Sequence, residues 1–123
     1  MSNIDAALSM VGLATKAGRT VNGSEMCENA IRKQKVFLLL TATDASPKTI
    51  GPILKLCAHH LVPVRNIADR ETLGRFSGKD NRAAVAVTDK GFAARIIEIL
   101  DGTREAGEQG SAKKSSREDR RNN

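Results

Sequence analysis

The chain opens with a stripe of apolar residues at helical spacing. Ile4, Leu8 and Val11 lie four and three residues apart, which places them on one face of a helix. Ser2 supplies a capping side chain at the start of this segment, and Gly18 is the residue type that often ends helices. The pattern therefore predicts an amphipathic first helix that ends near Gly18.

Four more helices are predicted from apolar spacing and from residues that start helices. The second covers Gly23–Lys33, the third follows the cap Ser46, a short fourth follows Asp69 and the last follows Asp89. Ser and Asp side chains accept hydrogen bonds from the free N–H groups of a first helical turn. These positions therefore set the expected helix starts.

Pro52 conflicts with the third helix, although this helix has the clearest apolar stripe of the chain. Proline has no N–H group, so a helix that began at Pro47 would lose the hydrogen bond from position 52 to the Lys48 carbonyl. We expect either a kink at Pro52 or a later start of the helix.

Three apolar runs between the helices are expected to be strands. The run Val36–Ala42 is apolar without alternation, as in a strand covered on both faces, and shorter runs occupy Val64–Ile67 and Ala83–Thr88. Strands that alternate with helices predict an α/β protein, a three-layer α/β/α sandwich with a small mixed sheet. All these elements lie in residues 1–101, which we expect to form one domain.

The last part of the chain, residues 102–123, has a different composition. Ala106 and Ala112 are its only hydrophobic residues, and it carries six basic and four acidic side chains. Such a segment cannot bury enough surface to offset the entropy lost on ordering. We expect a disordered charged tail, which either keeps the protein soluble or contacts phosphates.

Composition then narrows the class of partner. The 123 residues carry 20 Lys and Arg against 14 Asp and Glu, a net charge of +6, which favours nucleic acid first and an anionic membrane surface second. The start of the chain does not resemble a signal peptide, and the two cysteines are too few for a disulfide framework. We expect a cytoplasmic monomer that uses no membrane and no cofactor.

The chain contains three aromatic residues, Phe37, Phe76 and Phe92. All three lie on apolar stripes or runs, so we expect them in the core. Without exposed aromatic rings, binding of single strands by base stacking is not expected. Recognition of a structured RNA through its shape and backbone stays open.

The residue types that usually carry catalysis give weak signals. Neither the dinucleotide-binding glycine motif nor the phosphate-loop motif is present. A zinc site would need Cys57, His59 and His60, but His59 points away from the other two on a helix and a fourth ligand is missing. Cys27 and Cys57 both lie on buried stripes, where thiols are usually inert. We therefore expect no enzymatic activity, and an enzyme that uses Asp44 or Cys57 is kept as a third alternative.

Asp44 and the start of the second helix are better candidates for binding. Asp44 follows a buried strand and precedes a helix, the position at which α/β sheets bind anions. The N–H groups at Asn22–Ser24 suit a phosphate, and Gly23 allows close approach of a ligand. An ordinary helix cap with solvated charges explains the same residues and stays an alternative. Basic residues gather around the second helix and in a later loop, namely Lys16, Arg19, Arg32, Lys33 and Lys35, and Lys79 and Arg82.

Several segments in a fixed order resemble a known family. They are VGLATKAGR, VNGSEMCENAIRKQKVFLLLTATDASP, VPV, ETLGRFSGK and AVAVTDKGFA, within Ile4–Leu100. The chain resembles the YlxQ-type bacterial members of the superfamily of ribosomal proteins L-seven-Ae and L-thirty-e, whose best-known members bind kink-turn RNA. The resemblance implies the same α/β/α fold and a non-catalytic protein that binds structured RNA, either ribosomal or another folded RNA, in association with the ribosome or translation.

The resemblance also places the expected RNA contacts. The family's helix signature is Gly-x-(Asn or Lys)-(Glu or Gln)-x-x-Lys. Gly23 matches it, whereas Glu25, Met26 and Asn29 differ from the residues that contact guanines and phosphates in the family. Kink-turn specificity therefore stays open. The expected RNA-binding residues are Arg19, Asn22, Gly23, Ser24, Glu25, Asn29, Arg32, Lys33, Thr43, Asp44, Ala45, Lys79, Asn81 and Arg82.

A second function class competes with RNA binding. Glu25 and Glu28 place negative charge where RNA would approach, and they would tolerate a basic protein better than a phosphate. The alternative is a protein–protein interaction module that keeps the fold and has lost RNA specificity.

Overall fold

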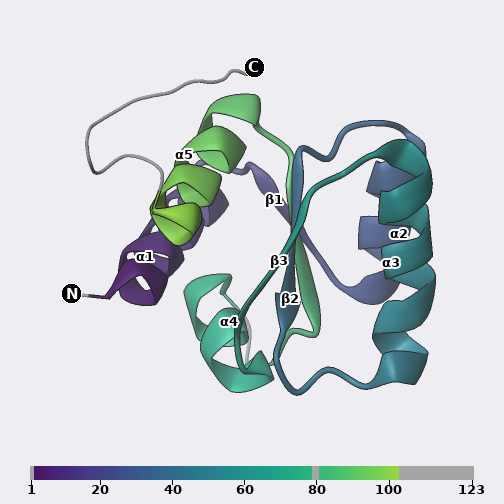
Figure 1. The fold of residues 1–123 in the computed structure, drawn as a ribbon, viewed down its shortest axis with the longest axis horizontal. Helices are drawn as coiled ribbons and strands as arrows, with labels where there is room; N and C mark the ends of the chain where they lie inside the picture. Colours follow the sequence, from purple (N-terminus) through teal and green to yellow (C-terminus); the bar gives the residue numbers. More distant parts are fainter. Residues whose placement is uncertain (1, 79–80, 103–123) are drawn as a thin grey trace.

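Helices and strands alternate through residues 2–78 and 81–102, the part of the chain that the computed structural model describes (Figure 1). In chain order they are α1 (Asn3–Lys16), β1 (Thr20–Asn22), α2 (Ser24–Arg32), β2 (Leu38–Ala42), α3 (Pro47–His60), β3 (Val64–Ala68), α4 (Arg70–Phe76), β4 (Ala84–Val87) and α5 (Lys90–Asp101). The predicted tail lies outside the described residues, except for Gly102.

The four strands form one mixed sheet in the order β1-β4-β2-β3. The pairs β1–β4 and β4–β2 are antiparallel, whereas β2 and β3 are parallel. Strands β1, β2 and β3 therefore end at the same end of the sheet, where β4 begins. This topology brings together loops that are far apart in the sequence.

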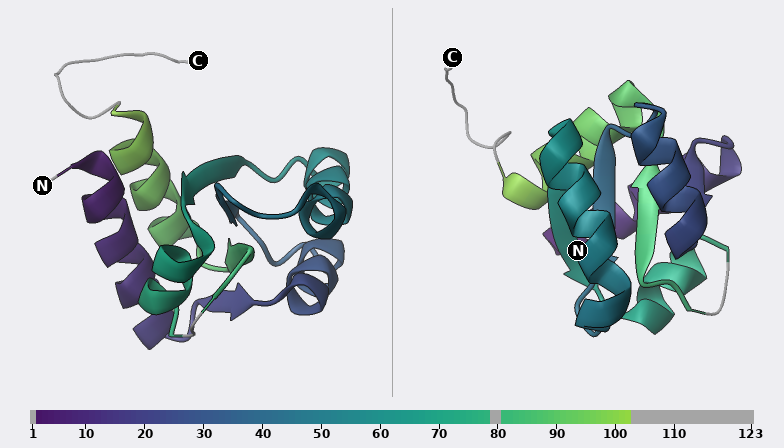
Figure 2. Two further views of the ribbon diagram at one scale, coloured as in Figure 1. Left: turned by 90° about the horizontal axis from the view of Figure 1, so that it is seen from below. Right: turned by 90° about the vertical axis from the view of Figure 1, so that its right-hand side faces the viewer.

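Helices cover both faces of the sheet, so the predicted three-layer sandwich is confirmed. Helices α1, α4 and α5 lie on one face, and α2 and α3 lie on the other (Figures 1 and 2). Every residue of β2 and β4 is buried, which explains their continuous apolar sequence. Successive side chains serve opposite faces, because Leu38 and Leu40 pack with α1 while Leu39 packs with α2 and α3.

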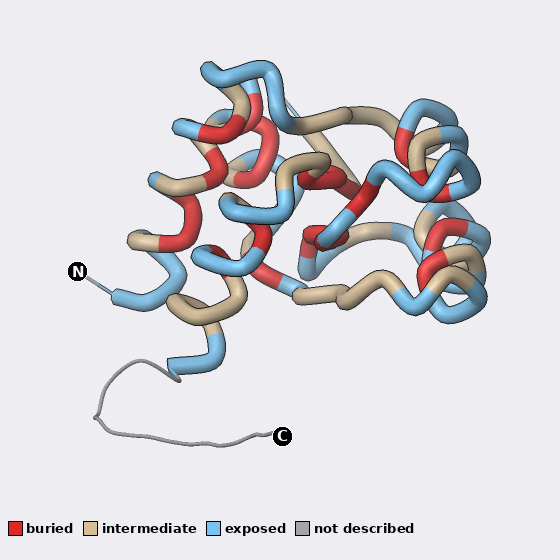
Figure 3. The backbone as a smooth tube through the Cα atoms, turned by 90° about the horizontal axis from the view of Figure 1, so that it is seen from above, coloured by how far each residue is buried: buried red, intermediate tan, exposed pale blue. Residues whose placement is uncertain are grey.

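The buried residues lie on the sheet and on the helix surfaces turned toward it (Figure 3). Cys27 and Ile31 of α2 meet Ile53 and Cys57 of α3 in the core on one face. Among the described residues, no helix is long and apolar enough to cross a lipid bilayer.

The predicted helix starts are confirmed by side-chain caps. Ser2, Ser46, Asp69 and Asp89 each accept a hydrogen bond from a backbone N–H of the helix that follows, at 2.7–3.2 Å. Gly18 adopts a φ of +74° just after α1, as its predicted role at the helix end requires.

Two expectations need correction, and one strand was not predicted. Helix α3 begins at Pro47 and continues through Pro52 to His60, so a later start was wrong. The short strand β1 was not predicted, because three residues of intermediate burial give no clear periodicity. Phe37 is 41% exposed instead of buried, since it precedes β2 at the end of the sheet, where the helices cover it only in part. Phe76 and Phe92 pack partly buried against the core.

Candidate functional site

Three segments that were predicted to contact a ligand lie together at one end of the sheet, which we name the Gly23 end. It comprises residues 22–25, residues 43–45 and residues 81–83. The strand register brings the segments together, because Asn22 pairs with Val85 and the Ala42 N–H donates to the Ala83 carbonyl at 2.9 Å. The Gly23 end is thus assembled from parts of the chain that are about 20 and 60 residues apart.

Helix α2 begins at this end without a side-chain cap. Its N-cap residue Gly23 has a φ of +91° and a ψ of 147°, a region that is essentially restricted to glycine. The other four described helices each have a Ser or Asp cap. Since no side chain caps α2, the N–H groups of its first turn are left for solvent or a ligand, with the positive end of the helix dipole behind them.

The Arg82 guanidinium lies beside the start of α2. A Cβ atom added to Gly23 would have Arg82 Nη1 as its nearest neighbour, at 4.0 Å. The Arg82 backbone N–H donates to the Arg70 carbonyl at 3.0 Å, which fixes the chain just before β4. The geometry therefore places a cation next to the free N–H groups of α2, an arrangement that suits an anion.

Two buried polar atoms of the described residues have no hydrogen-bond partner, and both lie at this end. They are Asn22 Oδ1, an acceptor, and Arg82 Nε, a donor. Asn22 is otherwise fixed, because its Nδ2 donates to the Ser77 carbonyl at 3.3 Å. An unpartnered buried polar group costs about 1–3 kcal/mol, so a ligand or water that satisfied both atoms would be stabilised here.

Asp44 has a structural partner at the same end. Its Oδ1 accepts a hydrogen bond from the Arg70 N–H at 2.8 Å, and its Oδ2 lies 3.6 Å from Arg70 Nε. Asp44 thus fastens the loop after β2, with its neighbours Thr43 and Ala45, to the start of α4. Its carboxylate is committed to this contact and does not point to catalysis.

The sequence interpretation missed Arg70 and Lys48, two exposed cations at the Gly23 end. Each lies in the first turn of a helix that directly follows a strand. Because β2 and β3 are parallel, these two helix starts share one end of the sheet. The predicted order of strands and helices already placed Lys48 and Arg70 at helix starts. Only the parallel pairing of β2 and β3 shows that these two helix starts lie at the same end of the sheet.

Other predicted residues lie away from the Gly23 end. Asn29 and Arg32 lie further along α2, with Arg32 about 12 Å from the start of the helix. Arg32 contacts Asn29 Oδ1 and Glu28 Oε1, both at 3.3 Å. Lys33 is the C-cap of α2, and Arg19 precedes β1, where its carbonyl accepts the Thr88 N–H at 2.9 Å.

The remaining predicted residues divide between the first turn of α2 and the loop before β4. Ser24 is half-buried and Glu25 is exposed in that first turn, and Asn81 is exposed beside Arg82. Lys79 lies outside the described residues.

The two thiols are built into the core and are poor nucleophiles. Burial raises the pKa of Cys27 to about 12 and the pKa of Cys57 to about 11. Cys27 Sγ also donates to the Val21 carbonyl at 3.4 Å. Both groups are therefore protonated at neutral pH.

Comparisons with known proteins identify the family of the chain. Residues 5–97 match the ribosomal protein L7Ae/L30e/S12e/Gadd45 family. The chain is 38% identical over 92 residues to the RNA-binding protein YlxQ of Bacillus subtilis, covering 75% of this chain and 92% of that protein. A solved structure of a Bacillus halodurans protein with unknown function superposes with a TM-score of 0.74 at 32% identity and covers 77% of this chain and 96% of that one.

A more distant structure has the same fold. The Giardia lamblia 15.5kD RNA binding protein superposes with a TM-score of 0.71 at 17% identity, covering 83% of this chain and 91% of that one. The family match over residues 5–97 and the relative from Bacillus subtilis confirm the family resemblance predicted from the sequence.

Proposed function

Because the chain belongs to the ribosomal protein L7Ae/L30e/S12e/Gadd45 family, we propose that it is a non-catalytic protein that binds structured RNA through the Gly23 end. The relative from Bacillus subtilis is itself named as RNA-binding. In the finer form of the proposal, the RNA is kink-turn-like and the protein works as a cytoplasmic monomer in association with the ribosome or with translation.

One observation supports the Gly23 end as the RNA-binding site. The uncapped start of α2 lies next to Arg82, and the two unpartnered buried atoms, Asn22 Oδ1 and Arg82 Nε, lie there too. RNA offers both kinds of missing partner, since phosphate oxygens accept hydrogen bonds while 2′-hydroxyls and base edges donate them. In this proposal the N–H groups of α2 and the Arg82 guanidinium hold phosphates, and Asn22 accepts from a ribose or a base.

The ion pair between Arg32 and Glu28 weakens the case for the alternative interaction module. That alternative rested on the negative charge of Glu25 and Glu28 near the RNA. The Glu28 carboxylate is paired with Arg32 at 3.3 Å, which offsets its charge. Glu25 lies in the first turn of α2, where a carboxylate is stabilised by the helix dipole.

A binding assay with three RNAs tests the proposal. Fluorescence anisotropy with the full chain is measured for a kink-turn RNA, for the same RNA with its kink-forming pairs mutated and for a plain duplex. Salt-sensitive binding to a structured RNA is expected, and preference for the intact kink-turn would support the finer proposal. Absence of salt-sensitive binding to any of the three RNAs would contradict the proposal that the protein binds structured RNA.

Lys79, which lies between α4 and β4 in the sequence, gives a quantitative test. If Lys79 contacts a phosphate, Lys79→Ala weakens RNA binding and flattens the slope of log affinity against log salt by about 1. An unchanged affinity and slope would remove Lys79 from the interface. Crosslinking in cells, followed by sequencing of the bound RNA, identifies the RNA.

A further inference from the structure

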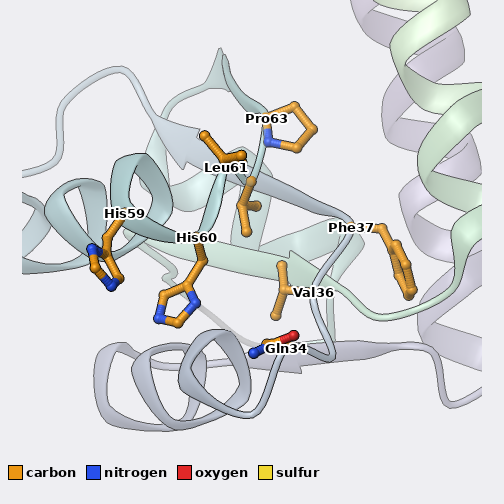
Figure 4. A pocket seen from close by; sticks show the side chains of 8 residues that line it. Gln34, Val36, Phe37, His59, His60, Leu61 and Pro63 are labelled. Carbon is orange, nitrogen blue, oxygen red and sulfur yellow. The ribbon is translucent and has the colours of Figure 1, made fainter.

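The opposite end of the sheet carries a pocket of about 400 Å³ that the proposed RNA function does not use. We name this region the Phe37 end. Its lining includes Gln34, Phe37, His59, His60, Leu61 and Pro63. Figure 4 shows His60 between the end of α3 and Gln34, with Leu61 and Pro63 on one side and Phe37 on another. The loops after α2 and after α3 therefore meet around this pocket.

Large apolar side chains are exposed at this pocket. Leu61 is 87% exposed, and Phe37 is 41% exposed. Leu61 is the most exposed of the large hydrophobic residues that the structure describes. Contact with an apolar partner would remove this surface from water, at roughly 25 cal/mol for each Å² that is buried.

The backbone around the pocket is strained at two positions. Gln34 and Leu61 both have a φ of 60°, and among the described residues they are the two non-glycine residues with a positive φ. The left-handed conformation costs a residue with a Cβ roughly 1–2 kcal/mol. Glycine would end α3 at Leu61 without this cost. A leucine that is both strained and exposed is unfavourable for the free protein, which points to a role in contact.

The two segments that line the pocket, residues 34–37 and 59–63, contain no acidic residue, although Asp89 follows β4 at the same end of the sheet. Between Glu28 and Asp44 the chain has no acidic residue, and between Asp44 and Asp69 it again has none. Lys33 and Lys35 flank Gln34 and are exposed, and neither belongs to an ion pair of the described residues. The nearby Arg32 is paired with Glu28. The pocket therefore combines the exposed apolar side chains of Phe37 and Leu61 with polar lining residues, and two exposed lysines lie beside it.

We propose that the Phe37 end binds an acidic protein segment that inserts one or two apolar side chains between Leu61 and Phe37. Its Asp or Glu side chains would pair with Lys33 and Lys35. We favour a peptide over RNA because the most exposed large side chain at the pocket, Leu61, is aliphatic and gains most from contact with an apolar side chain, although the rings of Phe37, His59 and His60 also line the pocket. This goes beyond the proposed RNA function, and the length of β2 separates the two ends by roughly 15 Å, so both partners can bind at once.

The test uses the full chain labelled with ¹⁵N and three short synthetic peptides. The first has a central Leu-Phe pair flanked by Asp and Glu. The second replaces the pair with Ser-Ser, and the third keeps the pair but replaces the acids with Lys. Amide shifts at residues 34–37 and 59–63 are expected with the first peptide, with at least about tenfold weaker binding of the other two.

Variants separate the pocket from the rest of α3. Leu61→Asn removes the apolar side chain while Asn tolerates the left-handed backbone, so the fold is retained. We expect this variant, and separately Lys33→Glu combined with Lys35→Glu, to weaken binding of the first peptide at least about tenfold. Leu54→Asn, a matched change of an exposed leucine on α3 outside the pocket, and Arg75→Glu on α4 are expected to leave it within about twofold.

Three outcomes would overturn the proposal. The first is absence of shifts at these residues with millimolar acidic peptide. The second is equal binding of the Ser-Ser peptide, which would show that charge alone acts. The third is that a short polyuridine RNA, and not the peptide, shifts these amides, which would assign the Phe37 end to RNA. None of these outcomes depends on the behaviour of the Gly23 end, so failure here is distinct from failure of the proposed function.

Discussion

The two ends of the sheet differ in the way they depart from an ordinary protein surface. At the Gly23 end polar groups are buried without partners, and a helix begins without a cap. At the Phe37 end apolar groups are exposed, and two residues with side chains adopt a left-handed backbone. The first departure calls for a polar, anionic ligand, and the second for an apolar one.

The topology explains why the two ends differ. Helices α2, α3 and α4 begin at the Gly23 end, so their positive dipole ends and free N–H groups gather there, whereas α2 and α3 end at the Phe37 end. Lys33 and Lys35 lie near the end of α2, where their charge offsets the negative dipole end of that helix. A count of cations along the chain therefore does not locate an anion site, because at the Gly23 end much of the positive potential comes from the backbone.

The largest effect is expected at Gly23. Gly23→Ala forces a Cβ into a glycine-only conformation and toward Arg82, which should shift the turn that presents the α2 N–H groups. We expect an RNA affinity at least about tenfold lower and a loss of about 1–3 kcal/mol in the free energy of unfolding. Anisotropy and urea titrations measure the two quantities.

Gly18→Ala is the matched control for this change. Gly18 also has a positive φ, of +74°, but has no atom within 4 Å of an added Cβ and lies before β1, at the other end of the sheet. A similar loss of stability of about 1 kcal/mol is expected, with RNA affinity unchanged. Equal losses of affinity in both variants would mean that binding reports only stability.

A smaller effect is expected at Arg82. Arg82→Met keeps much of the side-chain volume and removes the charge together with the unpartnered Nε donor. We expect RNA affinity to fall about fivefold and the salt slope to flatten by about 1, while peptide binding at the Phe37 end is unchanged. Arg82→Lys separates the effect of charge from that of geometry. Lysine keeps the positive charge and should keep the wild-type salt slope, but it lacks the forked N–H donors of the guanidinium. A wild-type slope in Arg82→Met would place the RNA elsewhere.

Most of the fold could be predicted from the sequence because local signals agreed with one another. The capping residues Ser46, Asp69 and Asp89 start the helices as expected, and the continuous apolar runs of β2 and β4 are buried strands. Strand β1 could not be predicted, since three half-buried residues have no periodicity of their own and are fixed by pairing with β4. Phe37 was misplaced for a related reason, because burial at the end of a strand depends on how far the helices extend.

The candidate site was predicted in part. Gly23 and the loops around Asp44 and Arg82 could be chosen from residue types and from the family resemblance, and the structure brings them together. Arg19 and Lys33 were grouped with them only because they are near in sequence, and they lie at other places in the fold. The hydrogen bond of Asp44 to Arg70 could not be predicted, since it requires the parallel pairing of β2 and β3.

The two cysteines allow the stability of the two ends to be compared. Cys27 lies in the first turn of α2, beneath the Gly23 end, and Cys57 lies near the end of α3, beneath the Phe37 end. Both thiols are buried, so their reaction with an alkylating reagent requires the surrounding structure to open. Alkylation followed by mass spectrometry therefore reports how readily each end opens. Faster reaction of Cys27 would mean that the Gly23 end opens more readily.

The raised pKa values of the two thiols predict a pH dependence of stability. Both thiols have a folded pKa above the ordinary value of 9.0, so their contribution is complete below pH 9 and is lost as the pH rises toward 11 and 12. The free energy of unfolding should fall above pH 9 by up to about 1.4 kcal/mol per pH unit for each thiol. Urea titrations at two alkaline pH values, compared between the wild type and Cys27→Ala, isolate the part due to Cys27.

The smallest effect is expected from relieving strain at the Phe37 end. Leu61→Gly removes the left-handed penalty and an 87% exposed side chain, while the unfolded chain gains the freedom of a glycine. Because these terms oppose each other, we expect a gain of only about 0.5 kcal/mol in the free energy of unfolding, with RNA affinity unchanged and peptide binding lost. Gly23→Ala does the reverse, because it adds a side chain at a residue with a positive φ. It should therefore lower both the free energy of unfolding and the RNA affinity. If Leu61→Gly instead lowered the free energy of unfolding, Leu61 would make stabilising contacts in the free protein. The Phe37 end would then differ from the Gly23 end in the polarity of its surface and not in backbone strain.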